Sequence, residues 1–262
     1  MRQHPAWLLF GLVLLAHLPA LQGLDFHYDD GHSLVRNPHI RELANLPRFF
    51  LDPTMFSENP ADAMYRPVVL VAHSLSEALS PGHPAGFLAL NLALHALAAL
   101  LLHQILGSIL PGGRSLFAAA IFALHPLQTE VINYASARSE TLAALGILMV
   151  VLAFLRHRDS ANDVWIAVLI AGQLLALGSK ETGVIAPLLL LAVHRAIPAG
   201  PQRISGRAIL ACTVVVVGYL IVYQSIREVS ISPDLRPVGA QLATQTKALL
   251  YYFRGALLPV DL

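Results

Sequence analysis

Residues Pro84–Leu110 have the sequence PAGFLALNLALHALAALLLHQILGSIL, which contains no aspartate, glutamate, lysine or arginine. An apolar run of about 20 residues is long enough to cross the hydrocarbon core of a bilayer as an α-helix. The whole chain has this character, because 56% of its residues are hydrophobic, 13% are charged and the mean hydropathy is +0.62. So few polar residues do not cover a soluble globule, and we predict an all-α, polytopic membrane helix bundle.

Further apolar stretches lie on both sides and predict a single transmembrane domain, residues 1–262, with about seven spans and the start of an eighth near Leu242. The other stretches are Ala6–Leu24, Ser115–Ala135, Thr141–Leu155, Val164–Gly178, Gly183–Ile197 and Ala208–Ile226. The first stretch also resembles a secretory signal. No small-residue cleavage site separates it from Asp25, so we favour a retained membrane anchor.

Basic residues set the expected orientation. With the N-terminus inside, the inner segments hold several arginines against the acids Asp159 and Asp163, the positive-inside pattern. Those arginines are Arg2, Arg114, Arg156, Arg158, Arg195, Arg203 and Arg207. The polar motifs of the other loops then face the extracytoplasmic side. Alanine- and leucine-rich spans with few lysines favour a bacterial inner membrane and a periplasmic site, or the endoplasmic reticulum membrane in a eukaryote.

The first extracytoplasmic loop, residues 25–83, is the longest connection between predicted spans. Apolar residues recur at helical spacing over Arg41–Leu51 and Pro67–Leu79, which predicts two amphipathic helices lying in the plane of the membrane surface. In the second helix the pattern predicts that His73 and Ser76 turn away from the apolar face.

Two other classes of site are excluded by residue usage. The lysines and arginines are scattered singly and form no basic stripe, so nucleic-acid binding is not expected. Cys212 is the only cysteine, which excludes an intramolecular disulfide and a cysteine metal cluster.

Asp29-Asp30 follows the first apolar stretch, and ionisable groups gathered near a bilayer indicate a functional site. A carboxylate that is partly desolvated and close to cations can accept a proton from an attacking hydroxyl. A solvated helix end and a divalent-cation site are the alternatives, although a hard cation needs more oxygen ligands than this pair supplies. The spacing leaves base and metal ligand both open.

Arg138 and Lys180 each lie near a glutamate in the sequence, Glu140 and Glu181 respectively. The simplest interpretation is a pair of neutralised ion pairs at helix ends. The alternative is a cationic clamp for a phosphate, because arginine binds phosphate through paired donors and lysine through a point charge.

Two polar motifs fall inside the predicted spans. His125-Pro126 interrupts the stretch Ser115–Ala135, and a broken helix at membrane depth is tolerated where it faces protein or a wet cavity. We therefore expect His125 to line a cavity. Asn91 and His95 share one helical face, and we interpret them chiefly as hydrogen-bonding residues between helices.

Several motifs follow one another in a distinctive order: Asp29-Asp30, Asn37-Pro38, Tyr65-Arg66-Pro67, Asn91 with His95, Leu124-His125-Pro126 with Thr129-Glu130, Arg138 with Glu140, and Ser179-Lys180-Glu181. The set resembles the N-terminal membrane part of the transmembrane and tetratricopeptide-repeat (TMTC-type) protein O-mannosyltransferases and their bacterial relatives. The resemblance runs from about Asp25 to Ile197. It implies a GT-C glycosyltransferase that uses a lipid-phosphate sugar such as polyprenyl- or dolichyl-phosphate mannose.

The resemblance further implies that Asp29 is the catalytic base, with Asp30 as its neighbour. A Ser or Thr hydroxyl of a protein acceptor would attack the anomeric carbon in one inverting displacement. We expect Arg138, Lys180 and Arg66 to bind the donor phosphate. Further motif residues are expected to line or support the cavity: Tyr65, Asn91, His95, His125, Glu130, Glu140 and Glu181. The expected partners are the lipid donor, the protein acceptor and membrane lipids.

The chain departs from the family pattern in two ways. Leu88 stands where a histidine often precedes the asparagine, and the chain ends at Leu262 in a new apolar stretch without tetratricopeptide repeats, so we expect a C-terminally truncated chain. A transporter or lipid-handling protein that binds an anion is the first alternative function, although the sequence has no internal symmetry. A non-catalytic membrane scaffold is the second, and it predicts that Asp29 is replaceable.

Overall fold

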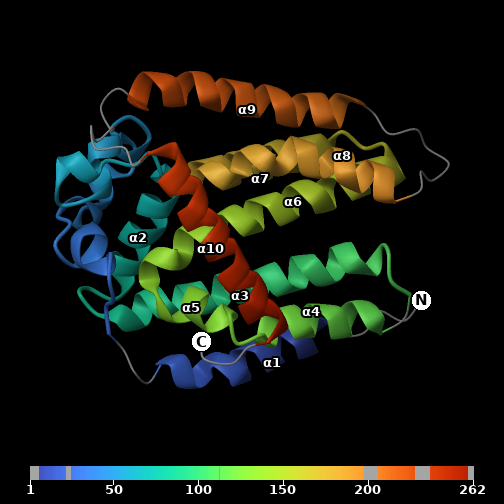
Figure 1. Ribbon diagram of the computed structural model, residues 1–262, viewed down its shortest axis with the longest axis horizontal. Coiled ribbons are helices and arrows are strands. Elements are labelled where there is room, and N and C mark those ends of the chain that lie inside the picture. Colours follow the sequence, from blue (N-terminus) through green and yellow to red (C-terminus); the bar gives the residue numbers. More distant parts are fainter. Residues whose placement is uncertain (1–5, 22–24, 112, 198–205, 228–236, 259–262) are drawn as a thin grey trace.

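The computed structural model describes residues 6–21, 25–111, 113–197, 206–227 and 237–258, and within them it contains helices and turns without a β-strand (Figure 1). The expected all-α class is therefore confirmed. The α-helices are α1 Ala6–His17, α2 Pro67–Leu79, α3 Pro84–Gly107, α4 Arg114–Leu124, α5 Gln128–Asn133, α6 Arg138–Ser160, α7 Val164–Ser179, α8 Ala186–Ala196, α9 Gly206–Arg227 and α10 Val238–Leu257.

The long helices lie side by side, and the first loop covers one end of them, at the left of Figure 1. One hydrophobic core joins α6, α7, α8 and α9 around Val150 and Leu169. Another joins α1, α3 and α4 around Ala96 and Ala119. The bundle thus has two groups of helices, with α3 and α6 in contact between them.

Helices α6 and α7 approach closely at two glycines. A Cβ atom on Gly146 would lie 2.5 Å from the carbonyl oxygen of Gly172 and from the backbone nitrogen of Ala176. Small residues at such a crossing let two helix backbones come together. The contact holds the end of α7, and with it the Ser179-Lys180 motif, against the beginning of α6.

Within the described part of the chain, three helical segments are long and apolar enough to cross a membrane: Pro84–Gly107, Ala135–Ser160 and Gly206–Ser225. The apolar helices α1, α2, α4 and α7 are shorter. The middle segment exceeds the expected stretch Thr141–Leu155, because the helix continues through polar residues at both ends.

The stretch Ser115–Ala135 is broken at His125-Pro126, where α4 ends, and the chain resumes as α5. Proline has no backbone N–H and disfavours a helical residue before it. The carbonyl of Ala123 instead contacts the Nε2 atoms of His17 at 3.0 Å and His95 at 2.9 Å. His95 therefore bonds from α3 to α4.

The first loop is a packed cap whose hydrophobic core joins Leu34, Phe49 and Met55 of the loop to Phe87 of α3. The helix expected over Arg41–Leu51 is wrong. The structure has separate 3-10 turns at Leu43–Asn45 and Arg48–Phe50, because Glu42 is extended, with φ −115° and ψ 112°, and Pro47 begins a new turn. Proline has no backbone N–H, so it cannot donate the hydrogen bond that a continuous helix would need at this position.

Helix α2 forms over the predicted residues, but its buried side differs from the expected one. His73 and Ser76 are each 1% exposed, whereas Leu79 is 86% exposed. The polar side faces inward because α2 packs against α3, α6 and α7, whose adjacent ends carry polar groups. Hydrophobic periodicity alone did not identify this face.

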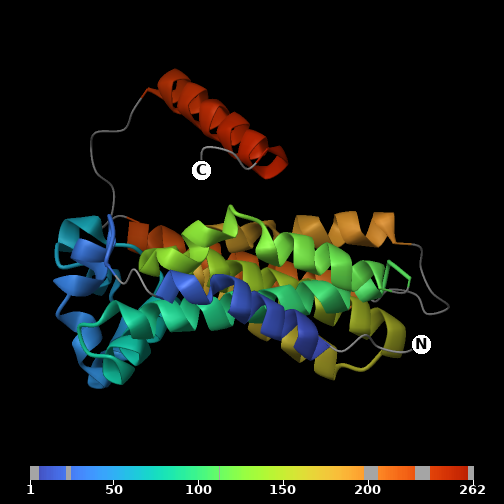
Figure 2. The same ribbon diagram turned by 90° about the horizontal axis from the view of Figure 1, so that it is seen from below.

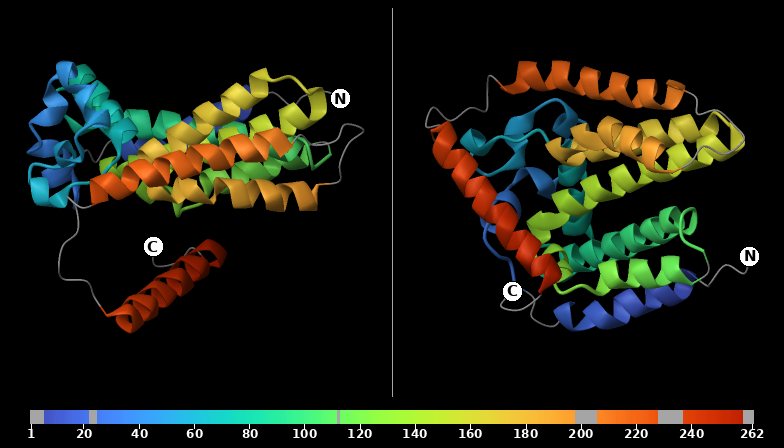
Figure 3. Two further views of the ribbon diagram at one scale, coloured as in Figure 1. Left: turned by 90° about the horizontal axis from the view of Figure 1, so that it is seen from above. Right: turned by 45° about the vertical axis from the view of Figure 1, so that its right-hand side comes forward.

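Helix α10 lies outside the packed bundle in Figure 2 and in the left view of Figure 3, and it contains the expected eighth apolar stretch near Leu242. Tyr251 and Tyr252 of α10 line a pocket together with residues of α5 and of the turn before it. Its large apolar residues are exposed, among them Leu249, Tyr252 and Phe253. Some sequence predictions fall on residues outside the described part of the chain: the end of the first stretch at residues 22–24, the basic residues Arg2 and Arg203, and the chain end at Leu262.

Candidate active site at the capped end of the bundle

The adjacent carboxylates of the Asp29-Asp30 motif have different environments. Asp30 is fully buried, and its Oδ1 accepts hydrogen bonds from the backbone N–H of Ser136 at 2.8 Å and from the Ser136 hydroxyl at 2.6 Å. Its Oδ2 accepts from the backbone N–H of His27 at 3.0 Å. Asp30 thus fixes the first loop to the segment just before α6, and its oxygens are committed to protein donors.

Asp29 is held by its backbone, while its side chain is 73% exposed. Its N–H donates to the Tyr134 hydroxyl at 3.2 Å, and its carbonyl accepts from the Ser33 hydroxyl at 2.6 Å. The carboxylate lies 3.8 Å from Nε2 of His32. Of the two carboxylates, Asp29 is the one available to take a proton from a bound molecule.

Tyr134 supports this arrangement from the segment after α5. Burial raises the pKa of Tyr134 to about 12, and the nearby carboxylates Asp29 and Asp30 raise it too. The phenol therefore remains protonated at neutral pH. It accepts the Asp29 N–H without adding a negative charge.

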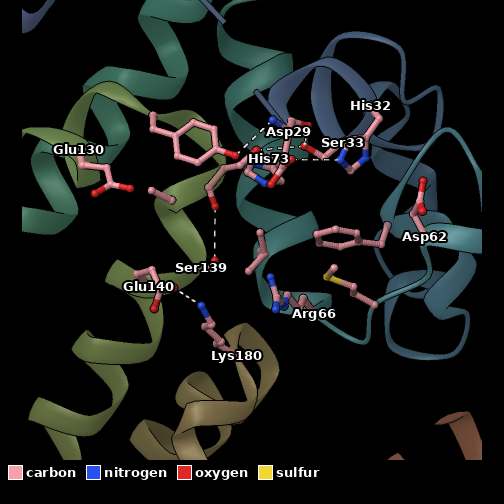
Figure 4. Close-up of a pocket in the computed structure, with 16 residues that line it drawn as sticks. Asp29, His32, Ser33, Asp62, Arg66, His73, Glu130, Ser139, Glu140 and Lys180 are labelled. Atoms are coloured by element: carbon pink, nitrogen blue, oxygen red, sulfur yellow. Dashed lines mark hydrogen bonds and ion pairs between the residues drawn. The ribbon is translucent and has the colours of Figure 1, made fainter. Parts of the chain in front are cut away.

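Asp29 faces a cavity of about 330 Å³ at the capped end of the bundle (Figure 4). The wall is built by the first loop, α2, α5, the beginning of α6 and the turn after α7. Polar lining residues are Asp29, His32, Ser33, Asp62, Arg66, His73, Glu130, Tyr134, Ser136, Ser139, Glu140 and Lys180. Five motifs separated in sequence therefore meet here, represented by Asp29, Arg66, Glu130, Glu140 and Lys180.

The two cations of the wall both have carboxylate partners. Lys180 forms an ion pair with Glu140 of α6, and Arg66 Nη2 lies 3.2 Å from Glu181 Oε2. The Arg66 side chain is 16% exposed and its guanidinium lies over the ring of Phe56. The ion-pair interpretation thus holds for Lys180, but its partner comes from another helix instead of from the adjacent Glu181.

Arg138 differs from its expected role as a direct phosphate ligand. It is fully buried, and it is absent from the cavity wall. Its Nε donates to Asn91 Oδ1 at 2.9 Å, Nη2 to the Phe87 carbonyl at 2.8 Å and Nη1 to the Ala72 carbonyl at 2.9 Å. The guanidinium joins α6 to α2 and α3, because its donors are directed at groups of those two helices.

Other predicted residues lie around this centre. Asn91 also donates to the carbonyls of Val131 and Tyr134, so it ties α3 to α5. His125 lies outside the cavity wall, with Nδ1 accepting the N–H of Leu127 at the helix break. His125 therefore does not line this cavity, and the local bond holds its ring at the turn.

A second, apolar cavity of about 820 Å³ lies between α2, α7 and α9. Tyr65, which donates its hydroxyl to the Phe50 carbonyl, lines this cavity instead of the polar one. Pro67 and Gly178 line it as well. Since Arg66 lies between Tyr65 and Pro67 in the chain, its segment borders both cavities.

Sequence reasoning missed His73, Tyr134 and Ser136. Ser136 and Tyr134 precede α6 without any recognisable motif, and they matter through contacts with a loop more than a hundred positions away. His73 was assigned to an outward face by the periodicity of α2. Among the described residues, no cluster of three or more His, Cys, Asp or Glu side chains is placed to hold a metal ion.

The chain is 32% identical to human protein O-mannosyl-transferase TMTC1 over 161 residues, which are 59% of this chain and 18% of that protein. The chain is similar to TMTC-type protein O-mannosyl-transferases. The TMTC4 protein of mouse is 27% identical over 208 residues, 69% of this chain and 28% of its own length. A Caenorhabditis elegans relative, protein O-mannosyl-transferase F38B6.6, is 26% identical over 225 residues, 81% of this chain and 31% of its own length.

The resemblance drawn from the motifs is thus confirmed by TMTC-type relatives at 26–32% identity. The chain spans about a fifth of the length of human TMTC1 and human TMTC3, 18% in each case. No family model matches the chain, and no solved structure matches it. These relatives are named protein O-mannosyl-transferases, so the activity in their names is that of a glycosyltransferase.

Proposed function

We propose that this chain is the membrane part of an inverting O-mannosyltransferase, which moves mannose from a polyprenyl- or dolichyl-phosphate donor to a Ser or Thr hydroxyl of a protein. The observation that carries the proposal is the difference in environment between Asp29 and Asp30. Asp30 is buried and fully hydrogen-bonded, which leaves Asp29 exposed on a cavity whose opposite wall holds Arg66 and Lys180.

The chemistry is a single displacement. The acceptor oxygen forms a bond to the anomeric carbon while the bond from that carbon to the phosphate oxygen breaks. Asp29 takes the hydroxyl proton, and the lipid monophosphate leaves with the bonding electrons. Attack from the face opposite the phosphate inverts the anomeric centre.

Arg66 and Lys180 are the groups proposed to meet the charge that develops on the leaving phosphate. Each is paired with a glutamate, so a phosphate entering the cavity competes with Glu181 or Glu140 for its cation. Partly buried cations are costly to leave without a partner, and an exchange of carboxylate for phosphate avoids that cost.

The apolar cavity is proposed to receive the first isoprenoid units of the donor. It is lined by hydrophobic residues of α7 and α9 and borders the Arg66 segment, so a phosphate at Arg66 has an apolar surface beside it. A lipid whose chain lies between helices while its phosphate reaches the polar cavity satisfies both regions. We propose that this site faces the extracytoplasmic side, because the inner segments carry the excess of arginine.

The test uses the natural gene product that contains this chain, in membranes that lack an endogenous protein mannosyltransferase. Radiolabelled polyprenyl-phosphate mannose is supplied, and label in protein is measured for the wild type, Asp29→Asn and Asp25→Asn. Asp25 is an exposed carboxylate of the same loop outside the cavity wall, so it is the matched control. We expect label with the wild type and Asp25→Asn and a loss of about 100-fold or more with Asp29→Asn.

Two outcomes would contradict the proposal. Equal label with Asp29→Asn at equal expression removes Asp29 from the mechanism. If the wild type transfers no label while the membranes accumulate the labelled lipid on the opposite leaflet, the chain is a lipid transporter.

A further inference from the structure

His73 lies on the inward side of α2, where it is 1% exposed and lines the polar cavity (Figure 4). Its Nδ1 lies 3.1 Å from Nη1 of Arg138. A guanidinium has only donors, so Nδ1 must be the acceptor in this contact. The proton of the neutral ring therefore resides on Nε2.

The His73 ring is neutral because its burial and the neighbouring Arg138 cation both disfavour a positive charge on it. Burial, and secondly the charge of Arg138, hold the pKa of His73 well below its usual range. Arg138 faces His73 from α6, and the aromatic ring of Phe87 faces it from α3 with centroids 6.2 Å apart. The described residues offer Nε2 no hydrogen-bond partner, so this N–H is the polar group of the ring left for the cavity.

Arg138 acts on the cavity through this ring. Four of its five N–H donors are directed at Asn91, at two carbonyls and at His73, and it does not line the cavity itself. A charged donor on Nδ1 polarises the imidazole and strengthens the opposite N–H as a donor. The positive charge of Arg138 is thereby transmitted to the cavity without an exposed cation.

We propose that His73 is a neutral Nε2–H donor to a phosphodiester oxygen of the sugar donor, with Arg138 as the positioning residue that fixes its tautomer. The assignment rests on the proposed function. A phosphodiester oxygen accepts hydrogen bonds and has no proton to give, which matches a group that only donates. Neutrality matters because an imidazolium in this cavity would favour the charged form of Asp29 and weaken it as a base.

Two substitutions separate the two nitrogens. In His73→Asn the amide oxygen replaces Nδ1 and accepts from Arg138, but no group reaches the place of Nε2. In His73→Gln the amide nitrogen replaces Nε2 as a donor, but the acceptor for Arg138 is lost. Both are neutral and polar.

We expect the two variants to have opposite effects on the kinetics and on the stability of the natural gene product in detergent: one loses activity and the other loses stability. For His73→Asn, kcat/KM for the lipid donor falls about 10- to 100-fold with an unchanged unfolding midpoint, because a hydrogen bond to a charged group is lost. For His73→Gln, kcat/KM stays within about fivefold of wild type while the unfolding midpoint falls. If activity and midpoint fall together in both variants, His73 has a structural role and the proposal is overturned.

A second readout does not depend on sugar transfer. Histidine is labelled with ¹⁵N, and the His73 signals are assigned by their absence from His73→Asn. We expect the neutral Nε2–H tautomer, and a shift of its Nε2–H signal on addition of farnesyl phosphate but not of mannose. A charged ring or an Nδ1–H tautomer overturns the proposal, and so does a response to mannose alone. Absence of sugar transfer by the wild type contradicts the proposed function and leaves this tautomer result intact.

Discussion

The two walls of the polar cavity accommodate their charged side chains in different ways. On the acidic wall, Asp30 is buried among protein donors and its neighbour Asp29 is left exposed. On the basic wall, Arg66 and Lys180 each hold a glutamate. One wall separates a structural carboxylate from an exposed one, whereas the other keeps its cations paired.

The difference indicates which wall is ready to react and which must first exchange a partner. Asp29 can take a proton without any rearrangement of the protein. Arg66 and Lys180 can bind an anion only when that anion replaces Glu181 or Glu140. Proton transfer at the acidic wall therefore depends on the position of Asp29. Anion binding at the basic wall depends on competition between carboxylate and phosphate.

The largest expected effect tests the division within the acidic wall. We expect Asp30→Ala to lower the free energy of unfolding by about 2–4 kcal/mol, because the N–H groups of His27 and Ser136 lose a buried charged acceptor. Asp29→Asn, at an exposed side chain, should leave the unfolding midpoint unchanged while sugar transfer is lost. Chemical denaturation in detergent, followed by helical circular dichroism, measures the first, and label transfer measures the second.

A reversed pattern would contradict this division. If Asp29→Asn destabilised the protein and Asp30→Ala did not, Asp30 would be the candidate base. Asp25→Asn is again the matched control, since it removes one exposed charge from the same loop.

The sequence predicted the membrane helices and the site to different degrees. Long runs without charge, such as that of α3, identify a helix because a helix satisfies all of its backbone hydrogen bonds within one such run. The convergence of Asp29, Arg66, Glu130 and Lys180 followed from placing their loops on one side of the membrane. Those predictions depend on composition and order, which the sequence displays directly.

Pairing and burial could not be predicted in this way. The separation of Asp30 from Asp29 depends on Ser136, and the burial of Arg138 depends on carbonyls of α2 and α3. The inward turn of His73 depends on which helices surround α2. Each is a contact between distant segments, and hydrophobic periodicity reports only whether a face is apolar.

A smaller effect tests the competition at the basic wall. We expect Glu140→Gln to lower KM for the lipid donor several-fold, because Lys180 no longer has a charged partner to exchange. Lys180→Met should raise KM by about tenfold, as expected for one lost contact between a cation and a phosphate. Initial rates over a range of donor concentrations measure both.

The comparison between the two substitutions decides the role of this ion pair. If Glu140→Gln and Lys180→Met both raise KM, the pair serves only to hold α6 against the turn after α7. Opposite changes support the exchange of Glu140 for phosphate.

The smallest effect concerns the dependence of stability on pH through His73. In the unfolded chain a histidine titrates near its usual pKa of about 6.5, whereas in the folded protein burial and Arg138 lower the pKa of His73 well below that value. Below pH 6.5 the unfolded state therefore binds more protons, so this group makes stability fall as the pH falls. Linkage gives about 1 kcal/mol between pH 6.5 and 5.5.

His73→Asn removes this contribution while it retains an acceptor for Arg138. We expect the wild type to lose about 1 kcal/mol more than the variant over that interval, measured by chemical denaturation at several pH values. Equal slopes for the two proteins would mean that His73 takes up a proton in the folded state over this pH interval, as it does in the unfolded chain. In that case Arg138 could not be donating to Nδ1, and the arginine charge would reach the cavity by some route other than this ring.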